Sequence, residues 1–128
     1  MNKTLLVIEN DEALVDLLSF YFSEQGYTVH TALDGNKGIE LALEHKPSVI
    51  ILDVIMSEMH GFDVLRALRG RPEMKDTVII MTSAKAYKPD IERARELGAT
   101  DYVVKPFRTD ELLAIVERQL ATPRQQEL

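Results

Sequence analysis

Two carboxylates, an amide, a hydroxyl and an ammonium group each follow a short apolar run in this 128-residue sequence. The clearest case is Asp53, which ends the run that begins at Val49 and is followed by a polar segment containing glycine. A run that is apolar on both faces predicts a buried strand of a parallel sheet covered by helices on both sides. In such sheets, ligands bind beyond the carboxyl ends of the strands. Asp53 is therefore the first functional candidate, although an acid in this place can equally cap the following turn.

The other polar residues follow apolar runs in the same way. They are Glu9 and Asn10 after residues 5–8, Ser83 after residues 78–81, and Lys105 after residues 102–104. Oxygen atoms of Glu9, Asn10 and Asp53 suit a hard divalent cation such as Mg²⁺. The hydroxyl of Ser83 and the ammonium group of Lys105 suit the oxygens of a phosphoryl group. Each residue alone is more often a helix cap, a turn hydroxyl or a solvated charge, but their shared placement predicts a metal and phosphoryl site.

The elements that must position these residues alternate along the chain. Strands are predicted at residues 5–8, 27–32, 49–53, 78–81 and 102–104, and a segment with helical apolar spacing follows each of them. The first helix is predicted to end at Gly26, with an inward face of Leu14, Leu17, Leu18, Tyr21 and Phe22. This alternation predicts an α/β fold, a doubly wound five-stranded parallel sheet with strand order 2-1-3-4-5, of the flavodoxin-like (βα)5 kind.

Composition limits the kind of protein this can be. We expect one domain over residues 1–121, followed by a polar tail or linker stub over residues 122–128. The chain has no cysteine, and its first apolar run is too short for a signal peptide or a membrane span, so we expect a cytoplasmic protein without membrane contact. A net charge of −6 argues against direct nucleic-acid binding by this domain.

These motifs resemble the receiver domain of two-component response regulators, in its single-domain, chemotaxis-regulator-like form. The resemblance extends from about Lys3 to Ala121. The resemblance rests on the acidic-pair position at Glu9-Asn10, the segment Leu52 to Met56 with Met59 and Gly61, the segment Ser83 to Ala86, Gly98-Ala99, and the segment Asp101 to Phe107. The spacings from Asp53 to Ser83 and from Ser83 to Lys105 also fit the family pattern.

The resemblance implies a function for each residue of the predicted site. It implies that Asp53 accepts a phosphoryl group from a histidine kinase or histidine phosphotransfer protein, and that Mg²⁺ neutralises charge during the transfer. It also implies that Lys105 binds the phosphoryl group, that Ile55 offers its backbone carbonyl to the metal, and that Ser83 and Tyr102 form the conformational switch. The expected partner is a downstream effector protein or a missing output domain. The domain is then not an enzyme, but a phosphoacceptor that assists its own phosphorylation and dephosphorylation.

The sequence departs from the family pattern at three positions, and the first departure leaves alternatives open. Asn10 stands where the family usually has an acid, Ser57 where it usually has proline, and His60 where it usually has aspartate. Asn10 motivates a second hypothesis, a receiver-like binding module that is not phosphorylated. A third hypothesis is an aspartyl-phosphate phosphatase, which is disfavoured because Ile55 stands where such enzymes place a second acid. We expect His60 to be a solvated loop residue without a chemical role.

Overall fold

The computed structural model describes residues 2–56 and 60–122. Within these residues, five parallel strands form a sheet of order β2-β1-β3-β4-β5, with five α-helices and a short 3-10 helix, η1. In chain order the elements are β1 (Thr4–Ile8), α1 (Glu12–Glu24), β2 (Thr28–Ala32), α2 (Gly35–His45), β3 (Val49–Asp53), α3 (Gly61–Arg69), η1 (Pro72–Met74), β4 (Val78–Ser83), α4 (Lys88–Glu96), β5 (Asp101–Val104) and α5 (Thr109–Ala121). The predicted fold class and strand order are confirmed.

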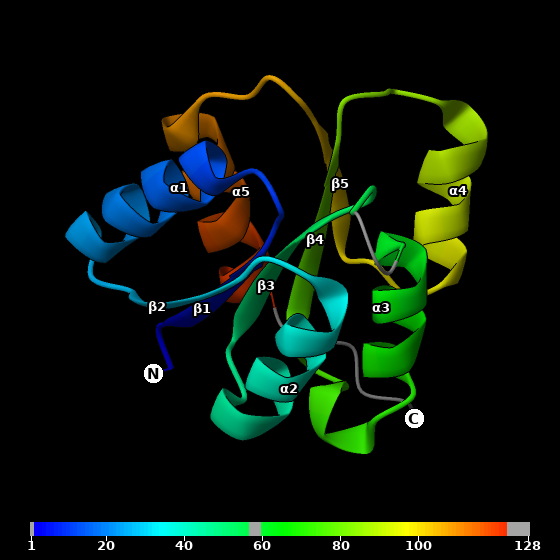
Figure 1. Ribbon diagram of the computed structural model, residues 1–128, viewed down its shortest axis with the longest axis horizontal. Helices are drawn as coiled ribbons and strands as arrows, with labels where there is room; N and C mark the ends of the chain where they lie inside the picture. Colours follow the sequence, from blue (N-terminus) through cyan, green and yellow to red (C-terminus); the bar gives the residue numbers. More distant parts are fainter. Residues whose placement is uncertain (1, 57–59, 123–128) are drawn as a thin grey trace.

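The helices form two layers around the sheet (Figure 1). Helices α1 and α5 cover one face, and helices α2, α3 and α4 cover the other. Successive side chains of a strand point to opposite faces, so the strands supply apolar residues to both layers. In β1, Leu5 and Val7 belong to the cluster under α1 and α5, whereas Leu6 and Ile8 belong to the cluster under the other helices. This two-sided burial explains why β1, β3 and β4 are nearly continuous apolar runs.

The strand register places the predicted polar residues at one edge of the sheet. Ile8 pairs with Leu52, so the residue after β1 lies beside the end of β3, and Ser83 pairs with Val104. Backbone hydrogen bonds continue past the strand ends, from the N–H of Glu9 to the carbonyl of Ala32 at 3.0 Å, and from the N–H of Lys105 to the carbonyl of Ser83 at 2.7 Å. The N–H of Val54 likewise donates to the carbonyl of Thr82 at 2.9 Å. The backbone that carries the polar side chains is therefore part of the sheet's hydrogen-bond network.

Helix α1 differs from the prediction in which residues face the core. Val15, Leu18 and Phe22 are its buried residues, whereas Leu17, which we expected on the inward face, is 51% exposed. Neighbouring residues of an α-helix point about 100° apart. Once Leu18 is directed at the sheet, Leu17 must therefore lie at the border of the buried stripe, and the prediction was wrong for Leu17 and missed Val15.

Strand β2 begins one residue later than predicted. The N–H of Tyr27 donates to the carbonyl of Phe22 at 3.1 Å, and the N–H of Gly26 donates to the carbonyl of Ser23 at 3.1 Å. These two bonds close the end of α1, and Gly26 adopts the positive φ of 93° that this helix ending needs. Tyr27 therefore bonds back to α1 and lies in the connection that precedes the strand.

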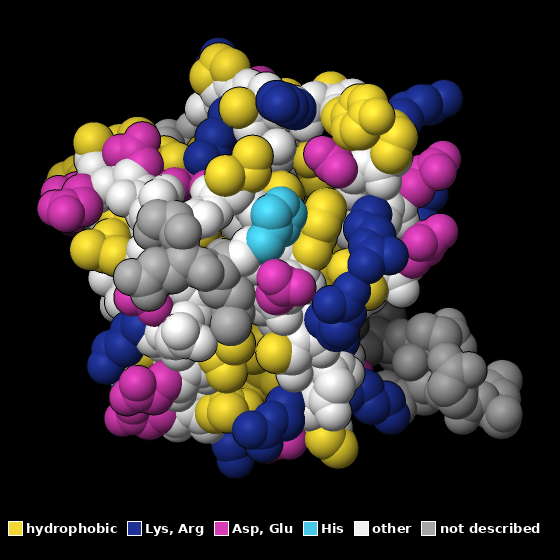
Figure 2. All heavy atoms as spheres, turned by 45° about the vertical axis from the view of Figure 1, so that its right-hand side comes forward, with side chains coloured by type: hydrophobic (Ala, Val, Ile, Leu, Met, Phe, Trp, Pro, Cys, Tyr) yellow, Lys and Arg dark blue, Asp and Glu magenta, His cyan; other side chains and the backbone are white. Residues whose placement is uncertain are grey.

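Charges are unevenly distributed along the chain. Of the fifteen Lys and Arg residues, only Lys3, Lys37 and Lys46 precede residue 60. Most of the others lie on the half built from α3, α4, β5 and α5, where basic side chains alternate with acidic and apolar ones on the face seen in Figure 2. The negative surplus therefore belongs to the half built from α1 and α2. Of the helices in the described part of the chain, none combines the length and the apolar character needed to cross a membrane.

Candidate functional site

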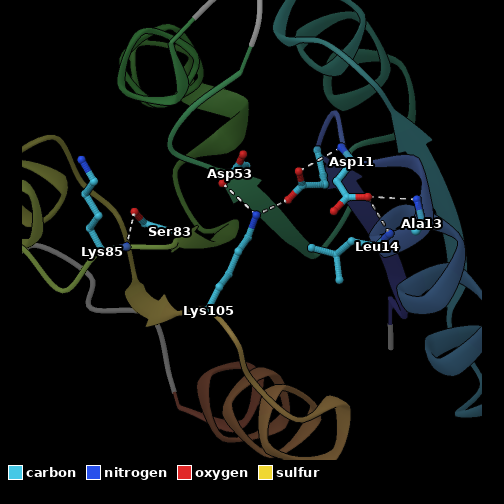
Figure 3. Close-up of polar contacts among 8 residues, drawn as sticks. Asp11, Ala13, Leu14, Asp53, Ser83, Lys85 and Lys105 are labelled. Atoms are coloured by element: carbon cyan, nitrogen blue, oxygen red, sulfur yellow. Dashed lines mark hydrogen bonds and ion pairs between the residues drawn. The ribbon is translucent and has the colours of Figure 1, made fainter.

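The carboxyl edge of the sheet holds a three-residue ionic network (Figure 3). The ammonium nitrogen Nζ of Lys105 lies 2.8 Å from Oε1 of Glu9 and 3.3 Å from Oδ1 of Asp53. The three residues come from the ends of β1, β3 and β5, which are far apart in sequence. Glu9 and Asp53 are buried, with 3% and 6% of their surface exposed. Three of the residues predicted from the sequence are thus brought into direct contact.

The geometry of Glu9 is set by a second contact. Its other carboxylate oxygen, Oε2, accepts a hydrogen bond from the backbone N–H of Asp11 at 3.1 Å. Asp11 in turn caps helix α1, because its Oδ1 accepts from the N–H groups of Ala13 and Leu14. Asn10 and Asp11 both belong to the residue types preferred at helix caps, and the structure assigns the cap of α1 to Asp11.

Two buried carboxylates share one ammonium group, and this imbalance explains the pKa shifts in the network. Burial raises the pKa of Asp53, and the negative charge of Glu9 raises it further, against the opposing effect of Lys105. Burial alone would lower the pKa of Lys105, but the hydrogen bond to Glu9 and the charge of Asp53 outweigh it and raise that pKa. The site therefore keeps a surplus of negative charge that a further cation would neutralise.

The predicted switch residues are held differently. Ser83 is buried at the end of β4, and its Oγ accepts a hydrogen bond from the N–H of Lys85 at 3.1 Å. Tyr102, in β5, donates its hydroxyl hydrogen to the backbone carbonyl of Lys85 at 3.2 Å. Both side chains therefore contact the backbone of one loop residue. Figure 3 shows Ser83 on the side of Asp53 away from Asp11.

Gly61 packs against the backbone of the strand end that carries Asp53. A Cβ atom at this position would collide with the carbonyl oxygen of Asp53 and with the backbone of Val54. Its N–H also donates to the carbonyl of Val54 at 2.7 Å. Glycine at position 61 thus allows helix α3 to begin directly beside the candidate phosphoacceptor.

The remaining predicted residues lie in the loops around the network. Asn10 is exposed in the loop after β1, and Ile55 is 58% exposed in the loop after β3. Ser57 and Met59 lie outside the described residues. The peptide between Lys105 and Pro106 is cis.

Sequence reasoning missed the capping role of His60 and did not decide between Asn10 and Asp11 for the cap of α1. His60 is exposed, as expected, but its Nδ1 accepts a hydrogen bond from the N–H of Phe62 at 3.2 Å and so caps helix α3. A histidine directly before a predicted helix is a weak indication of such a cap, because it is outside the preferred cap residues. For Asp11 the indication was present, since aspartate is a preferred cap, but Asn10 fits the same preference.

The donor chemistry of this edge is compatible with Mg²⁺. A single positive centre, the Nζ of Lys105, already contacts both Glu9 and Asp53, which shows that the two carboxylates converge. Mg²⁺ prefers a few carboxylate or carbonyl oxygens and completes its shell with water and phosphate oxygens. Within residues 2–56 and 60–122, no group of three or more acidic, histidine or cysteine side chains has the arrangement of a metal site. Any metal here would therefore depend on two acids together with carbonyl, amide or water oxygens.

Comparisons with known proteins agree with the fold. The family model of the response regulator receiver domain matches residues 5–117, which include every residue of the ionic network. The chemotaxis protein CheY4 of Vibrio cholerae is similar in structure, with a TM-score of 0.88 and 30% identity over 92% of this chain and 98% of that one. A putative response regulator of Chloroflexus aurantiacus gives a TM-score of 0.88 at 28% identity over 95% and 100% of the two chains.

A third similar structure comes from a larger signalling protein. It is the receiver domain of a signal transduction histidine kinase from Syntrophus aciditrophicus, with a TM-score of 0.86 and 27% identity over 98% of this chain and 95% of that one. The fold and the site thus define a receiver domain. The chain belongs to the family of response regulator receiver domains and has the CheY-like fold of two-component signalling proteins.

Proposed function

We propose that this receiver domain accepts a phosphoryl group on Asp53, with the help of Mg²⁺, and that the modification changes its binding to a protein partner. The observation that supports this proposal is the position of the Asp53 carboxylate, at the end of β3 and 3.3 Å from the Nζ of Lys105. Ser83 supplies a hydroxyl from the end of the neighbouring strand β4. The carboxylate of Asp53 is thus available as the nucleophile, and Lys105 and Ser83 as a cation and a hydroxyl donor for the oxygens of the transferred phosphoryl group.

The transfer forms a bond between an Asp53 carboxylate oxygen and phosphorus, while the bond from phosphorus to the donor breaks and the donor keeps its electron pair. Burial and the charge of Glu9 raise the pKa of Asp53, so its surroundings stabilise the carboxylate charge less than water would. Such a carboxylate is the better nucleophile, and Lys105 opposes the shift and favours the ionised form. Lys105 and Ser83 then bind oxygens of the transferred group.

Mg²⁺, when bound, would neutralise negative charge that gathers at the site during transfer. The residues that would hold it are Glu9 and Asp53 through their carboxylates, Ile55 through its backbone carbonyl and Asn10 through its side-chain amide. The surplus negative charge on Glu9 and Asp53 supports this assignment. A phosphoryl group adds roughly −1.5 to −2 charges, which increases the demand for a cation.

The switch follows from the two hydrogen bonds to Lys85. The Oγ of Ser83 accepts from the N–H of Lys85, and its hydroxyl hydrogen is the group that would be donated to a phosphoryl oxygen. When the Ser83 side chain rotates toward the phosphoryl group, the N–H of Lys85 loses its acceptor. The loop after β4 is then free to move, and with it the carbonyl that Tyr102 contacts. The change therefore spreads to α4, β5 and α5, where a downstream effector or an output domain would detect it.

The phosphodonor is a histidine kinase or a histidine phosphotransfer protein, as the receiver family implies. The chain itself acts as a phosphoacceptor that assists its own phosphorylation and dephosphorylation, and not as an enzyme with a separate substrate. Ile55 supports this, because it offers an apolar side chain where an aspartyl-phosphate phosphatase has its second acid. Sustained phosphate release from a small phosphoester would contradict it.

One experiment separates this proposal from a receiver-like module that is not phosphorylated. The protein is incubated with acetyl phosphate and Mg²⁺, and its intact mass is measured. We expect the mass of one added phosphoryl group, which is lost on treatment with hydroxylamine. No added mass under any Mg²⁺ concentration would favour the binding module, for which the exposed amide of Asn10 is the motivating observation.

A further inference from the structure

Asp11 has no part in the proposed phosphorylation chemistry, yet it lies directly beside the ionic network. Its side chain accepts from the N–H of Ala13 at 3.1 Å and from the N–H of Leu14 at 3.3 Å, which fixes the first turn of α1. The backbone of Asp11 is extended, with φ −84° and ψ 104°, as expected of a capping residue. The side chain thus sets the direction of the peptide on which it sits.

The backbone N–H of Asp11 is aimed at Glu9. It donates to Oε2 of Glu9 at 3.1 Å, while Oε1 of the same carboxylate accepts from the Nζ of Lys105 at 2.8 Å. A glutamate side chain has three rotatable bonds, so two contacts at opposite oxygens restrict it far more than either alone. The dashed lines in Figure 3 mark a connected series of contacts. It runs from the N–H of Asp11 through the Glu9 carboxylate to Lys105 and then to Asp53.

We propose that Asp11 is a positioning residue for the site: its helix cap orients the carboxylate of Glu9, and through Glu9 the ammonium group of Lys105. The consequence for Mg²⁺ rests on the proposed function, but the orientation of Lys105 does not. The arrangement matters in this chain because the neighbouring Asn10 is an exposed amide. Glu9 is then the acid that accompanies Asp53 at the network, so its direction decides where the second carboxylate charge lies.

A purely structural cap predicts something different. Such a cap would stabilise α1 only. Removing it would then leave the orientation of the Lys105 side chain unchanged. Helix α1 is also held by Val15, Leu18 and Phe22 in the core, so loss of the cap should leave the domain folded. The variant Asp11→Ala removes the cap, whereas Asp11→Ser keeps a capping hydroxyl without the charge.

The experiment measures the reactivity of Lys105. Folded protein is treated with a limiting amount of acetic anhydride, and acetylation of Lys105 is compared by peptide mass spectrometry with that of the exposed Lys37. Glu9→Gln gives the reactivity of Lys105 after its closest partner has lost its negative charge. Val15→Ala serves as the matched control, because it weakens α1 from inside the core and leaves the cap intact.

We expect Asp11→Ala to raise the acetylation of Lys105, relative to that of Lys37, by about threefold or more, toward the value of Glu9→Gln. The reason is that the charge-assisted hydrogen bond from Lys105 to Glu9 is weakened when Glu9 is no longer oriented. Asp11→Ser and Val15→Ala should remain near the unmodified protein. Unchanged reactivity in Asp11→Ala would overturn the proposal. So would an equal rise in Asp11→Ser or Val15→Ala, because the effect would then come from charge or from general loosening.

Calorimetric titration with Mg²⁺ alone links this result to the site. Asp11→Ala should weaken Mg²⁺ binding by about three- to tenfold and Asp11→Ser should not, since an unoriented carboxylate loses entropy on binding. If the unmodified protein binds no Mg²⁺, the metal part of the proposed function fails, while the lysine reactivities still decide the positioning role. If Mg²⁺ binds equally to Asp11→Ala with Lys105 more reactive, the cap orients Lys105 only and the part concerning the metal is overturned.

Discussion

The two sides of the site are held together by different kinds of contact. On one side, Glu9, Lys105 and Asp53 form charged contacts of 2.8 and 3.3 Å with both carboxylates buried. On the other side, Ser83 and Tyr102 are attached to the backbone of Lys85 by neutral hydrogen bonds of 3.1 and 3.2 Å. The first set is costly to break, because a buried charge would lose its partner. The second exchanges at little cost, because its groups can bond to water or to a phosphoryl oxygen instead.

This difference separates two tasks at the same edge of the sheet. A nucleophile must be held in one place before the phosphoryl donor arrives, because small displacements reduce the transfer rate strongly. A switch needs two states close in free energy, so its contacts must be weak enough to change partners. The charged side, formed by Glu9, Lys105 and Asp53, therefore suits the phosphoryl transfer. The neutral side, formed by Ser83, Tyr102 and the backbone of Lys85, suits the conformational response.

The largest expected effect comes from removing the nucleophile. Asp53→Asn keeps the size of the side chain but removes the charged oxygen that would bond to phosphorus. We expect no phosphoryl group to be added by acetyl phosphate and Mg²⁺, as measured by intact mass. If the variant still gains one hydroxylamine-labile phosphate, another acid is the acceptor and the assignment is wrong.

Removing the shared cation should destabilise the charged side in a pH-dependent way. Lys105→Met leaves Glu9 and Asp53 buried without their ammonium group, and it raises the pKa of Asp53 above its already raised value because Lys105 no longer lowers it. A folded-state pKa above the unfolded one reduces stability as the pH rises and restores it as the pH falls. We expect a loss of about 1 to 3 kcal/mol at pH 8, moderated by the 24% exposure of the Lys105 side chain.

Thermal unfolding at several pH values measures this effect. The difference in Tm between the unmodified protein and Lys105→Met should shrink from pH 8 to pH 5. Lys37→Met, which removes an exposed lysine of α2, is the control and should change Tm little at either pH. A difference in Tm that is independent of pH would mean that lost packing, and not the unpaired carboxylates, accounts for the destabilisation.

Asn10→Asp should add charge to the charged side. A carboxylate in place of the amide is expected to tighten Mg²⁺ binding by about ten- to a hundredfold, or on the order of 1 to 3 kcal/mol, after its own desolvation is subtracted. Repulsion with Glu9 and Asp53 should at the same time lower the Tm of the metal-free protein. Calorimetry with Mg²⁺ and thermal unfolding test both expectations. Equal Mg²⁺ affinities would show that Glu9 already supplies the needed charge.

The response should be largest on the neutral side and in the elements next to it. Beryllofluoride with Mg²⁺ imitates the phosphoryl group, and we expect the amide resonances that shift to lie in α4, β5 and α5, with smaller changes in α1 and α2. The reason is that Ser83 and Tyr102 share the backbone of Lys85, next to α4. Two-dimensional NMR of the labelled protein gives the answer. Shifts confined to α1 and α2 would contradict the comparison between the two sides.

The smallest expected effect is that of Tyr102→Phe. It removes one hydrogen bond to the carbonyl of Lys85, so stability should fall by only about 0.5 to 1 kcal/mol. Labelling of Asp53 by acetyl phosphate should remain, because the charged side is untouched. The beryllofluoride-induced shifts of α4 should change, since one attachment of the loop is lost. Loss of labelling in this variant would show that the two sides are not separate.

The sequence by itself determined the architecture and the edge at which the site lies. Short continuous apolar runs rich in β-branched residues, such as Val49 to Leu52, indicate strands that are covered on both faces, and helices between them indicate parallel crossovers. Parallel strands end at one edge, so the order of residues along the chain is enough to assign Glu9, Asp53, Ser83 and Lys105 to that edge.

Only the tertiary structure decided which of these groups contact one another. The sequence predicted that Lys105 and Ser83 bind phosphoryl oxygens and that Glu9 and Asp53 bind a cation, whereas the folded chain places the Nζ of Lys105 between Glu9 and Asp53. It also chose Asp11 over Asn10 as the cap of α1 and turned Leu17 outward. Side-chain directions depend on strand register, helix rotation and the balance of charges across three strands. No single segment contains the information for the Lys105 contacts, because they join residues that are brought together only when the sheet forms.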